Sequence, residues 1–235
     1  MSKNKIFFGG KDLSEYGIVP SGSGVYSAPA RKRTMVGIPG RNGELSFEDG
    51  SFENIPVKYP VGVKRPVDKH LDDCRNYLLS LGDYQRLEDT YHPDEYRMGI
   101  YQGGFEPSIS VMGRIGKVEL TFNCKPQRFL KEGEREIEVS SGDVVFNPTN
   151  FKALPLVRAY GTGTLSMGGE TIRIDTANSY TDIDCESMDA FKGATNCNDN
   201  ITLLSGEFFC LNPGTNTVTF SGITRVIITP RWWKI

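Results

Sequence analysis

Residues 117–122 read Lys-Val-Glu-Leu-Thr-Phe, a strict alternation of polar and apolar side chains. Successive side chains of a β-strand point to opposite faces, so this alternation buries one face and leaves the other in water. Residues 136–139, Glu-Ile-Glu-Val, alternate in the same way. Residues 39–43, Pro-Gly-Arg-Asn-Gly, carry turn chemistry beside the strand-like run at 43–47. These patterns predict a mainly β protein.

Residues 66–81 break the β pattern. Apolar side chains recur there every three or four positions, which places them on one face of a helix. Pro66 suits the first helical turn. The helix is short, so we expect it to lie on a sheet rather than to form a coiled coil. The members of its apolar face are Val67, Leu71, Cys74, Leu78 and Leu81. Of these, Val67, Leu71 and Leu78 are candidates for a structural or interface role.

Charge and length exclude several classes of protein. The 235 residues include 27 Lys+Arg and 29 Asp+Glu, a formal net charge of −2. No basic excess is available for electrostatic binding to nucleic acid. The apolar runs are too short to span a membrane or to form the core of a signal peptide. We expect a soluble protein that is made in the cytosol and stays there until it is assembled or released.

The chain changes composition near residue 140. Residues 1–140 carry 20 basic and 20 acidic side chains, whereas residues 141–235 carry only 7 and 9. This shift predicts two domains, 1–140 and 141–235, with the final strand packing on one or the other. Short strands and regular turns in the second part are typical of a β-sandwich. The expected strands are 153–160, a hairpin over 165–175 about Gly168-Gly169, 180–185, 201–204, 217–220 and 226–229.

Residues with catalytic or metal-binding chemistry are few. The five cysteines include no CxxC pair, which favours reduced, mostly buried thiols over a disulfide scaffold. The two histidines lack metal-ligand spacing. His70 and Cys74 share a helix face, so a Cys–His pair stays open beside the simpler reading of a core thiol next to a half-exposed histidine. We expect no catalytic residue, no metal and no cofactor.

Two charged clusters admit two interpretations each. Asp182, Asp184 and Glu186 alternate along one strand and could bind calcium or act as paired carboxylates. The favoured interpretation is a strand with a solvated outer face, which also discourages stray strand pairing. The basic run at 31–33, Arg-Lys-Arg, is either a solvated face or a contact between subunits.

The segment 230–235 reads Pro-Arg-Trp-Trp-Lys-Ile and holds both tryptophans of the chain. A free tail would not normally expose two indoles. Pro230, Arg231, Trp232 and Trp233 are therefore structural or interface candidates, with burial in a core and burial between subunits both open.

Several motifs together resemble the distal tail protein (Dit) family of siphovirus-type phages and prophages. They run from near the first residue to the last, in the same order, and each is structural rather than catalytic. The motifs are Phe-Gly-Gly-Lys-Asp-Leu at 8–13, Tyr-Gly-Ile at 16–18, Ile-Pro-Gly-Arg-Asn-Gly-Glu-Leu at 38–45, Phe-Asn-Pro-Thr at 146–149, Ala-Leu-Pro at 153–155, Tyr-Gly-Thr-Gly at 160–163, Ile-Asp-Cys-Glu at 183–186 and Ile-Thr-Pro-Arg-Trp-Trp at 228–233. Arg41 lies in the third motif and is a further interface candidate.

The resemblance implies a non-enzymatic adapter at the tip of a phage tail. It implies that residues 1–140 form a belt domain with one α-helix that closes a homohexameric ring, and that residues 141–235 form a galectin-like β-sandwich. The implied partners are the major tail tube protein, the tail-associated lysin or fibre protein and receptor-binding components. DNA would only pass through the channel, no membrane would be involved, and assembly would take place in the cytoplasm of the bacterial host.

Two other functions compete with the adapter. The C-terminal sandwich could be a carbohydrate-binding module for host cell-wall sugars, or Asp182 and Asp184 could serve a glycosidase. A galactose site of the galectin kind needs a stacking tryptophan and a polar cluster that includes histidine, yet residues 141–229 contain neither Trp nor His. Tyr160 and Tyr180 could stack on a sugar, although turn or core packing would explain them equally well. We therefore expect this domain to dock proteins.

Overall fold

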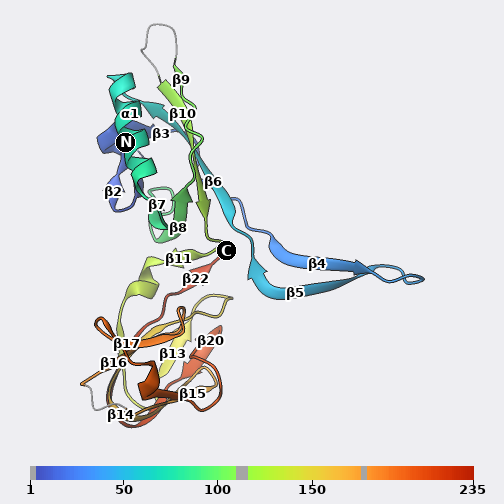
Figure 1. Ribbon diagram of the computed structural model, residues 1–235, viewed down its shortest axis with the longest axis vertical. Helices are drawn as coiled ribbons and strands as arrows, with labels where there is room; N and C mark the ends of the chain where they lie inside the picture. The colour runs from blue at the N-terminus through green and yellow to red at the C-terminus, as the bar shows by residue number, and fades with distance from the viewer. Residues whose placement is uncertain (1–3, 110–115, 176–178) are drawn as a thin grey trace. The chain divides into compact units, whose positions relative to one another are not determined.

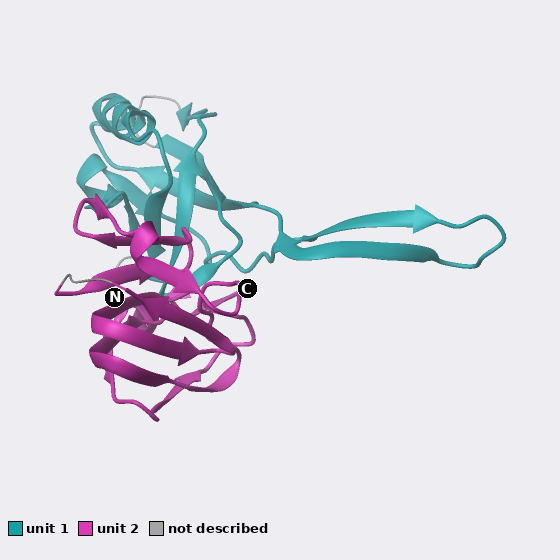
Figure 2. Ribbon diagram, turned by 60° about the horizontal axis from the view of Figure 1, so that its bottom comes forward, with its two compact units in different colours: residues 1–128, 235 teal, residues 129–234 magenta. Residues whose placement is uncertain are grey.

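The computed structural model describes residues 4–109, 116–175 and 179–235, and it is mainly β, as the sequence predicted. The chain forms two compact units, one reaching to Arg128 and including Ile235, the other covering 129–234 (Figure 2). The junction expected near residue 140 therefore lies inside the second unit. The physical reason is that β12 (Ile137–Val139) pairs with β21 (Thr219–Thr229) and so belongs to that unit.

Unit 1 is built on an antiparallel sheet whose strands follow the order β2-β1-β7-β8-β10-β6-β3, with β9 paired to β10 (Figure 1). The elements of this sheet are β1 (Ile6–Phe8), β2 (Lys11–Asp12), β3 (Ile18–Pro20), β6 (Ile55–Val63), β7 (Gln85–Asp89), β8 (Glu95–Tyr101), β9 (Ser108–Ile109) and β10 (Gly116–Cys124), with the short 3-10 turn η1 (Leu13–Tyr16) between β2 and β3.

The alternating stretch 117–122 lies in β10, where Val118, Leu120 and Phe122 are buried and Lys117 and Glu119 are exposed. β10 pairs with β6 along its whole length, and β6 alternates in the same way. The two strands therefore present one continuous apolar face to the core of unit 1.

One α-helix occurs among the described residues, α1 (Val67–Ser80), as the sequence predicted. Its buried side chains Val67, Leu71, Cys74 and Leu78 belong to the same apolar cluster as the inward residues of β6 and β10. The helix thus covers the sheet of unit 1 with the face that its apolar periodicity indicated.

A separate two-stranded sheet, β4 (Arg31–Gly37) paired with β5 (Glu44–Phe52), forms a long hairpin that we call the arm (Figures 1 and 2). Its strands pair with no strand of the main sheet. The turn expected at residues 39–43 is the tip of this hairpin, and Gly40 and Gly43 have φ of 78° and 83° there, a conformation that suits glycine.

Unit 2 contains an antiparallel sheet in the order β12-β21-β14-β16-β17-β18, in which β15 joins β14 to β19, and a small sheet of β13 and β20. Its remaining elements are β11 (Arg128–Leu130), η2 (Lys131–Glu134), β13 (Val144–Asn147), β14 (Leu156–Met167), β15 (Glu170–Ile174), β16 (Thr181–Asp184), β17 (Asp189–Lys192), β18 (Thr195–Asn196), η3 (Asn198–Asn200), β19 (Ile201–Leu203), β20 (Gly214–Thr217) and β22 (Trp233–Lys234).

The hairpin about Gly168-Gly169 is confirmed as β14 and β15. The separate strands expected at 217–220 and 226–229 are wrong, because β21 runs without interruption from Thr219 to Thr229. The two backbones nearly touch where β14 and β21 bend: a Cβ atom on Gly163 would lie 2.0 Å from the Ser221 carbonyl oxygen. Glycine in a strand pattern thus marked a bend inside a pair of long strands and not a break between strands.

A single apolar cluster fills unit 2, with inward residues such as Val157, Leu165, Ile183 and Ile228 at 0% exposure. No helix in the described part of the chain is long and apolar enough to cross a membrane.

Candidate assembly surfaces

The arm exposes apolar side chains that a free hairpin would normally hide. Phe47 is 58% exposed, Met35 52% and Val36 42%, and Ile38 at the start of the tip is 39% exposed. Val36 lies opposite Leu45, and Phe47 lies opposite Thr34, so one face carries a short apolar strip. Hairpins of two strands are marginally stable in water unless something packs on them. The arm is therefore the strongest candidate for a surface that another chain covers.

The charges of the arm are divided between its strands. β4 begins with Arg31, Lys32 and Arg33, whereas β5 contains Glu44, Glu48 and Asp49. Within the hairpin, Arg33 Nε donates to Glu48 Oε2 at 2.8 Å, and Arg31 stands 3.9 Å from the other carboxylate oxygen. The predicted interface candidate Arg41 lies exposed at the tip. The arm thus has a basic strand edge and an acidic strand edge.

The helix candidates Val67, Leu71 and Leu78 are buried at 4%, 6% and 0% exposure in the core of unit 1. They hold α1 on its own sheet. Because their side chains are inaccessible, a partner chain would have to use the other faces of α1.

The C-terminal candidates converge on unit 2. Arg231, with a positive φ of 57°, donates from Nη1 and Nη2 to the two carboxylate oxygens of Asp184, at 2.6 and 2.9 Å. Trp232 is 4% exposed within the apolar cluster, and its carbonyl oxygen accepts a bond from the Leu130 backbone nitrogen at 2.8 Å. Pro230 is also buried. This segment closes unit 2 by joining β22 to β11.

Trp233 is only half-buried, yet a stacking contact and a hydrogen bond hold its side chain in place. Its ring stacks on Phe151 with centroids 4.4 Å apart, and Nε1 donates to the Lys152 carbonyl oxygen at 2.9 Å. Both indoles therefore have partners within unit 2.

The acidic strand differs from the expected solvated face. Asp182 is 3% exposed and accepts two bonds from Arg158, at 2.6 and 2.9 Å. Asp184 is held by Arg231, and Glu186 lies beyond the end of β16. The predicted alternation holds for Asp182 and Asp184 but not for Glu186, and arginines on the neighbouring β14 and on the C-terminal segment pair with the carboxylates. Their oxygens are engaged in ion pairs, which leaves no open cluster for calcium or for paired acid catalysis.

Thiols and imidazoles are not arranged for nucleophilic chemistry. Cys74 is fully buried, and burial raises the pKa of its thiol to about 12. His70 instead places Nδ1 2.9 Å from the Lys64 carbonyl oxygen. Among the residues that the structure describes, no group of three or more His, Cys, Asp or Glu side chains could hold a metal ion.

Tyr160 and Tyr180 share an outer face of unit 2 with ring centroids 5.9 Å apart, so core packing does not explain them. Cations of the chain itself stand over both rings, Arg158 4.7 Å from the centroid of Tyr180 and Arg225 5.4 Å from that of Tyr160. A sugar that stacked on either ring would compete with these cation–π contacts.

The crystal structure of the SPP1 Dit (gp 19.1) protein, described as a paradigm of the hub adsorption apparatus in phages that infect Gram-positive bacteria, matches all of this chain. The TM-score is 0.77 with 100% of both chains covered, and 14% of the residues are identical. The fold is that of a Dit protein. Because the match covers both chains completely, the Dit fold includes both units described above.

Two structures of the phage p2 baseplate in its activated conformation, with Sr and with Ca, match at a TM-score of 0.49 and 10% identity. They cover 96% and 97% of this chain and 97% and 98% of theirs, and at that score they add nothing to the assignment of the Dit fold. No protein-family model and no curated protein matches the chain.

Sequence reasoning found the tip and part of one strand of the arm but missed the arm as a separate element. Two signals were available. The segment 21–30, Ser-Gly-Ser-Gly-Val-Tyr-Ser-Ala-Pro-Ala, interrupts the β pattern just before the arm, and the basic run at 31–33 precedes acidic residues at 44–49. A turn flanked by oppositely charged strands that both lack clean alternation is typical of a hairpin exposed on both faces.

Proposed function

We propose that this chain is a distal tail adapter, a non-enzymatic structural subunit of the tail tip of a phage virion. In this proposal unit 1, which replaces the belt domain expected at residues 1–140, closes a homohexameric ring that is assembled in the cytoplasm of the bacterial host. The ring joins the tail tube protein to a tail-associated lysin or fibre protein and carries receptor-binding components. The likeness of the fold to the SPP1 hub protein supports this function.

The observation that carries the proposal is the exposed arm. Its apolar strip and its unpaired strand edges need a cover, since exposed strand edges readily pair with other chains. Each subunit has one arm, so the simplest cover is a neighbouring copy of the same chain.

The division of charge on the arm favours a head-to-tail arrangement. A basic edge on one copy is complementary to an acidic edge on the next, whereas a two-fold arrangement of identical edges would place like charges together. Contacts between unlike surfaces form a closed ring when the rotation between copies matches the ring symmetry. Exposed ion pairs contribute only about 0–1 kcal/mol each, so the apolar strip supplies most of the affinity and the charges set the register.

The base of the arm offers a clean test. The Glu53 backbone nitrogen donates to the Ala30 carbonyl oxygen at 2.9 Å, so residues 31–52 can be replaced by an Asn-Gly turn without moving their anchors. We expect the complete protein to form rings in negative-stain images, with the mass of a hexamer by light scattering, alone or on co-expression with its tail partners.

The variant without the arm should remain folded by circular dichroism but should not form rings. Rings of unchanged mass without the arm would refute the role of the arm. A complete protein that stays monomeric from low to high micromolar concentration, with and without tail partners, would refute the adapter function.

A further inference from the structure

The tip of the arm contains the only Asn-Gly sequence of the chain, Asn42-Gly43. Both residues are exposed, and they lie between β4 and β5, where the hairpin turns back (Figure 1). The side-chain amide of an asparagine can react with the backbone nitrogen of the next residue. That reaction is fastest before glycine, because no Cβ atom obstructs the approach. The sequence thus places its most reactive pair of this kind at the tip of the arm.

Gly43 presents its backbone nitrogen without obstruction. A Cβ atom at this position would meet nothing within 4 Å, so no neighbouring group crowds the nitrogen. The nitrogen donates to no described backbone oxygen, whereas the Arg41 nitrogen donates to the Ile38 carbonyl oxygen at 3.1 Å. The Asn42 side chain makes no hydrogen bond with any described residue either, so it is free to rotate toward the Gly43 nitrogen.

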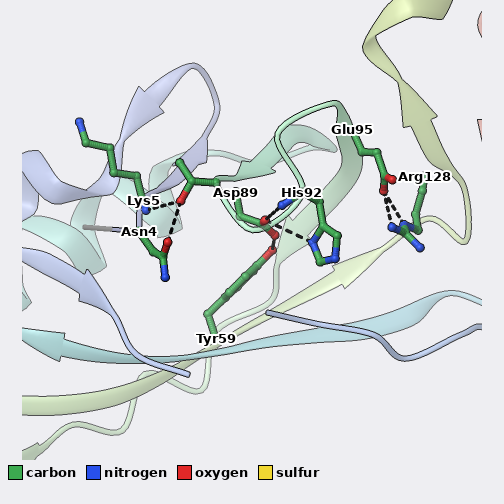
Figure 3. Close-up of polar contacts among 8 residues, drawn as sticks. Asn4, Lys5, Tyr59, Asp89, His92, Glu95 and Arg128 are labelled. Atoms are coloured by element: carbon green, nitrogen blue, oxygen red, sulfur yellow. Dashed lines mark hydrogen bonds and ion pairs between the residues drawn. The ribbon is translucent and has the colours of Figure 1, made fainter. Parts of the chain in front are cut away.

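Other asparagine side chains are held by hydrogen bonds. Asn4 Oδ1 accepts a bond from Thr90 Oγ1 at 3.4 Å (Figure 3). Asn198 Oδ1 accepts a bond from the Ala190 backbone nitrogen at 2.6 Å. An amide that is bonded in this way must leave its partner before its carbon can meet the next backbone nitrogen, and neither residue precedes a glycine. Asn42 therefore differs from both in its freedom and in its neighbour.

The second strand of the arm contains a comparable pair, Asp49-Gly50, the only Asp-Gly sequence of the chain. Gly50 also has a positive φ, of 80°, and open space at its Cβ position. The Asp49 carboxylate, however, accepts bonds from the Ser51 hydroxyl at 2.6 Å and from the Ser51 backbone nitrogen at 2.8 Å. These bonds hold the pKa of Asp49 below its ordinary value, so the group stays an anion, which a nitrogen nucleophile attacks poorly. The same hairpin thus supplies an unreactive comparison for Asn42.

We propose that Asn42 is a site of spontaneous deamidation. Hydroxide removes the proton from the Gly43 backbone nitrogen, and this nitrogen attacks the side-chain carbon Cγ of Asn42. The new C–N bond closes a five-membered succinimide ring. The bond from Cγ to the side-chain nitrogen breaks, and that nitrogen takes a proton from water and leaves as ammonia. Water then opens the ring at one of its two carbonyl carbons, so one amide is exchanged for one carboxylate without any oxidation or reduction.

The two products change the tip in different ways. Opening of the ring at Cγ gives aspartate, which places a negative charge beside Arg41. Opening at the main-chain carbonyl carbon gives isoaspartate, which carries the same charge and also routes the backbone through Cγ, so that the chain is one atom longer. The tip therefore changes in charge with age, and in the isoaspartate form it also changes in length. This inference rests on the arm of one subunit and does not depend on the ring.

Mass spectrometry of the complete protein tests the reaction. The protein is kept for days as a dilute monomer in mildly alkaline buffer, beside a free peptide of residues 36–47 that gives the rate of an unrestrained Asn-Gly pair. Residue 42 should gain one mass unit at a rate close to that in the peptide, and faster as the pH rises. In water enriched in heavy oxygen it should also take up one labelled oxygen. An Asn42 that stays intact in the protein while the peptide converts would overturn the proposal.

Two controls use the same digests. Asn42→Gln should show no conversion over the same period, because the longer side chain would have to close a less favourable six-membered ring. Asp49 should remain aspartate, with no isoaspartate detected by electron-transfer fragmentation, since its carboxylate is ionised and bonded to Ser51. An undiminished mass gain in the Asn42→Gln variant, or isoaspartate that forms at Asp49 as fast as at Asn42, would contradict the proposal.

Discussion

The backbone of Trp232 passes so close to Gly133 that only glycine fits at position 133. A Cβ atom added to Gly133 would lie 2.3 Å from the Trp232 backbone nitrogen, and the Arg231 nitrogen donates to the Gly133 carbonyl oxygen at 2.8 Å. The turn η2 and the C-terminal segment therefore meet backbone to backbone. The φ of Gly133 lies outside the left-handed range, so its backbone conformation does not require glycine. Glycine is required here because a larger residue would not fit.

Gly133→Ala should separate these two segments. Overpacking in a closed site costs about 1–3 kcal/mol, and a clash with backbone belongs at the upper end because no side chain can rotate away. Both tryptophans of the chain lie in this segment, so urea unfolding followed by tryptophan fluorescence reports on it directly. The control is Gly82→Ala, where the added Cβ meets open space. Equal stability of the two variants by circular dichroism would disprove the contact.

The two indoles should differ in their contribution to stability. Trp232→Ala empties a buried site and should cost about 3–5 kcal/mol. Trp233→Phe keeps a ring on Phe151 and loses the hydrogen bond to the Lys152 carbonyl oxygen, so about 1 kcal/mol is expected. Deletion of residues 230–235 should lower the melting temperature or yield insoluble protein. A deletion variant that melts and assembles like the parent would show that the segment is dispensable.

Asp184→Asn should lower stability at neutral pH by about 1–3 kcal/mol, because two charge-assisted bonds to Arg231 are lost. Burial by itself raises the pKa of Asp184, but the bonds from Arg231 and the nearby backbone outweigh it and hold the pKa below the unfolded value of 3.8. The carboxylate therefore stabilises the fold above about pH 3.8, and this contribution is lost as the pH falls through the lower folded value.

The asparagine variant should accordingly show a flatter stability curve below pH 4 than the wild type. Asp175→Asn is the control, since Asp175 forms an exposed pair with Arg173. Exposed pairs contribute about 0–1 kcal/mol, so this variant should follow the wild-type curve closely. Parallel acid curves for wild type and Asp184→Asn would argue against a role of the Arg231 pair.

Phe47→Ser should weaken assembly without weakening the subunit. Phe47 is 58% exposed on the arm, so its loss removes no core contact. Phe146→Ser supplies a matched control, because Phe146 is 62% exposed on unit 2. Analytical ultracentrifugation should show dissociation for Phe47→Ser alone. If Phe146→Ser dissociates the assembly and Phe47→Ser does not, the ring closes through unit 2.

The complete protein should not bind galactosides. Arg158 and Arg225 stand over the rings of Tyr180 and Tyr160, so a stacked sugar would compete with these cation–π contacts. Its hydroxyls would gain little over their hydrogen bonds to water. Calorimetric titration with galactosides and with host cell-wall polysaccharide should give no saturable heat. A dissociation constant below about 1 mM, equivalent to roughly −4 kcal/mol, would instead favour a carbohydrate-binding module.

Local patterns predicted much of the fold because they depend on one segment at a time. Alternation located β10, the three-and-four spacing located α1, and Gly168-Gly169 located a hairpin. The long strand β21 was missed because its bend requires the partner backbone of β14 to come close, which no single segment reveals. The sequence placed the unit boundary near residue 140 and not at 128, because β12 pairs with β21 across the long separation from Ile137 to Ile228.

The candidate sites were less predictable for a related reason. Trp232 and Trp233 could be picked out by composition, but their partners Gly133, Phe151 and Lys152 come from distant segments. The sequence predicted a solvated Asp182, because Arg158, which forms an ion pair with Asp182, lies on another strand and gives no signal in the local pattern.

The pairing of β11 with β22 means that the second unit begins and ends at the same place. The Leu130 backbone nitrogen donates a hydrogen bond to the Trp232 carbonyl oxygen, so β11, where the chain enters the unit, lies beside β22, where it leaves. A short peptide linking these ends, with a new opening at the exposed Gly193–Ala194 turn, would give a circular permutant of unit 2 that keeps the strand pairs formed within that unit. The order of the strands along the chain therefore depends on where unit 2 is opened, whereas the pairing of strands inside the unit does not.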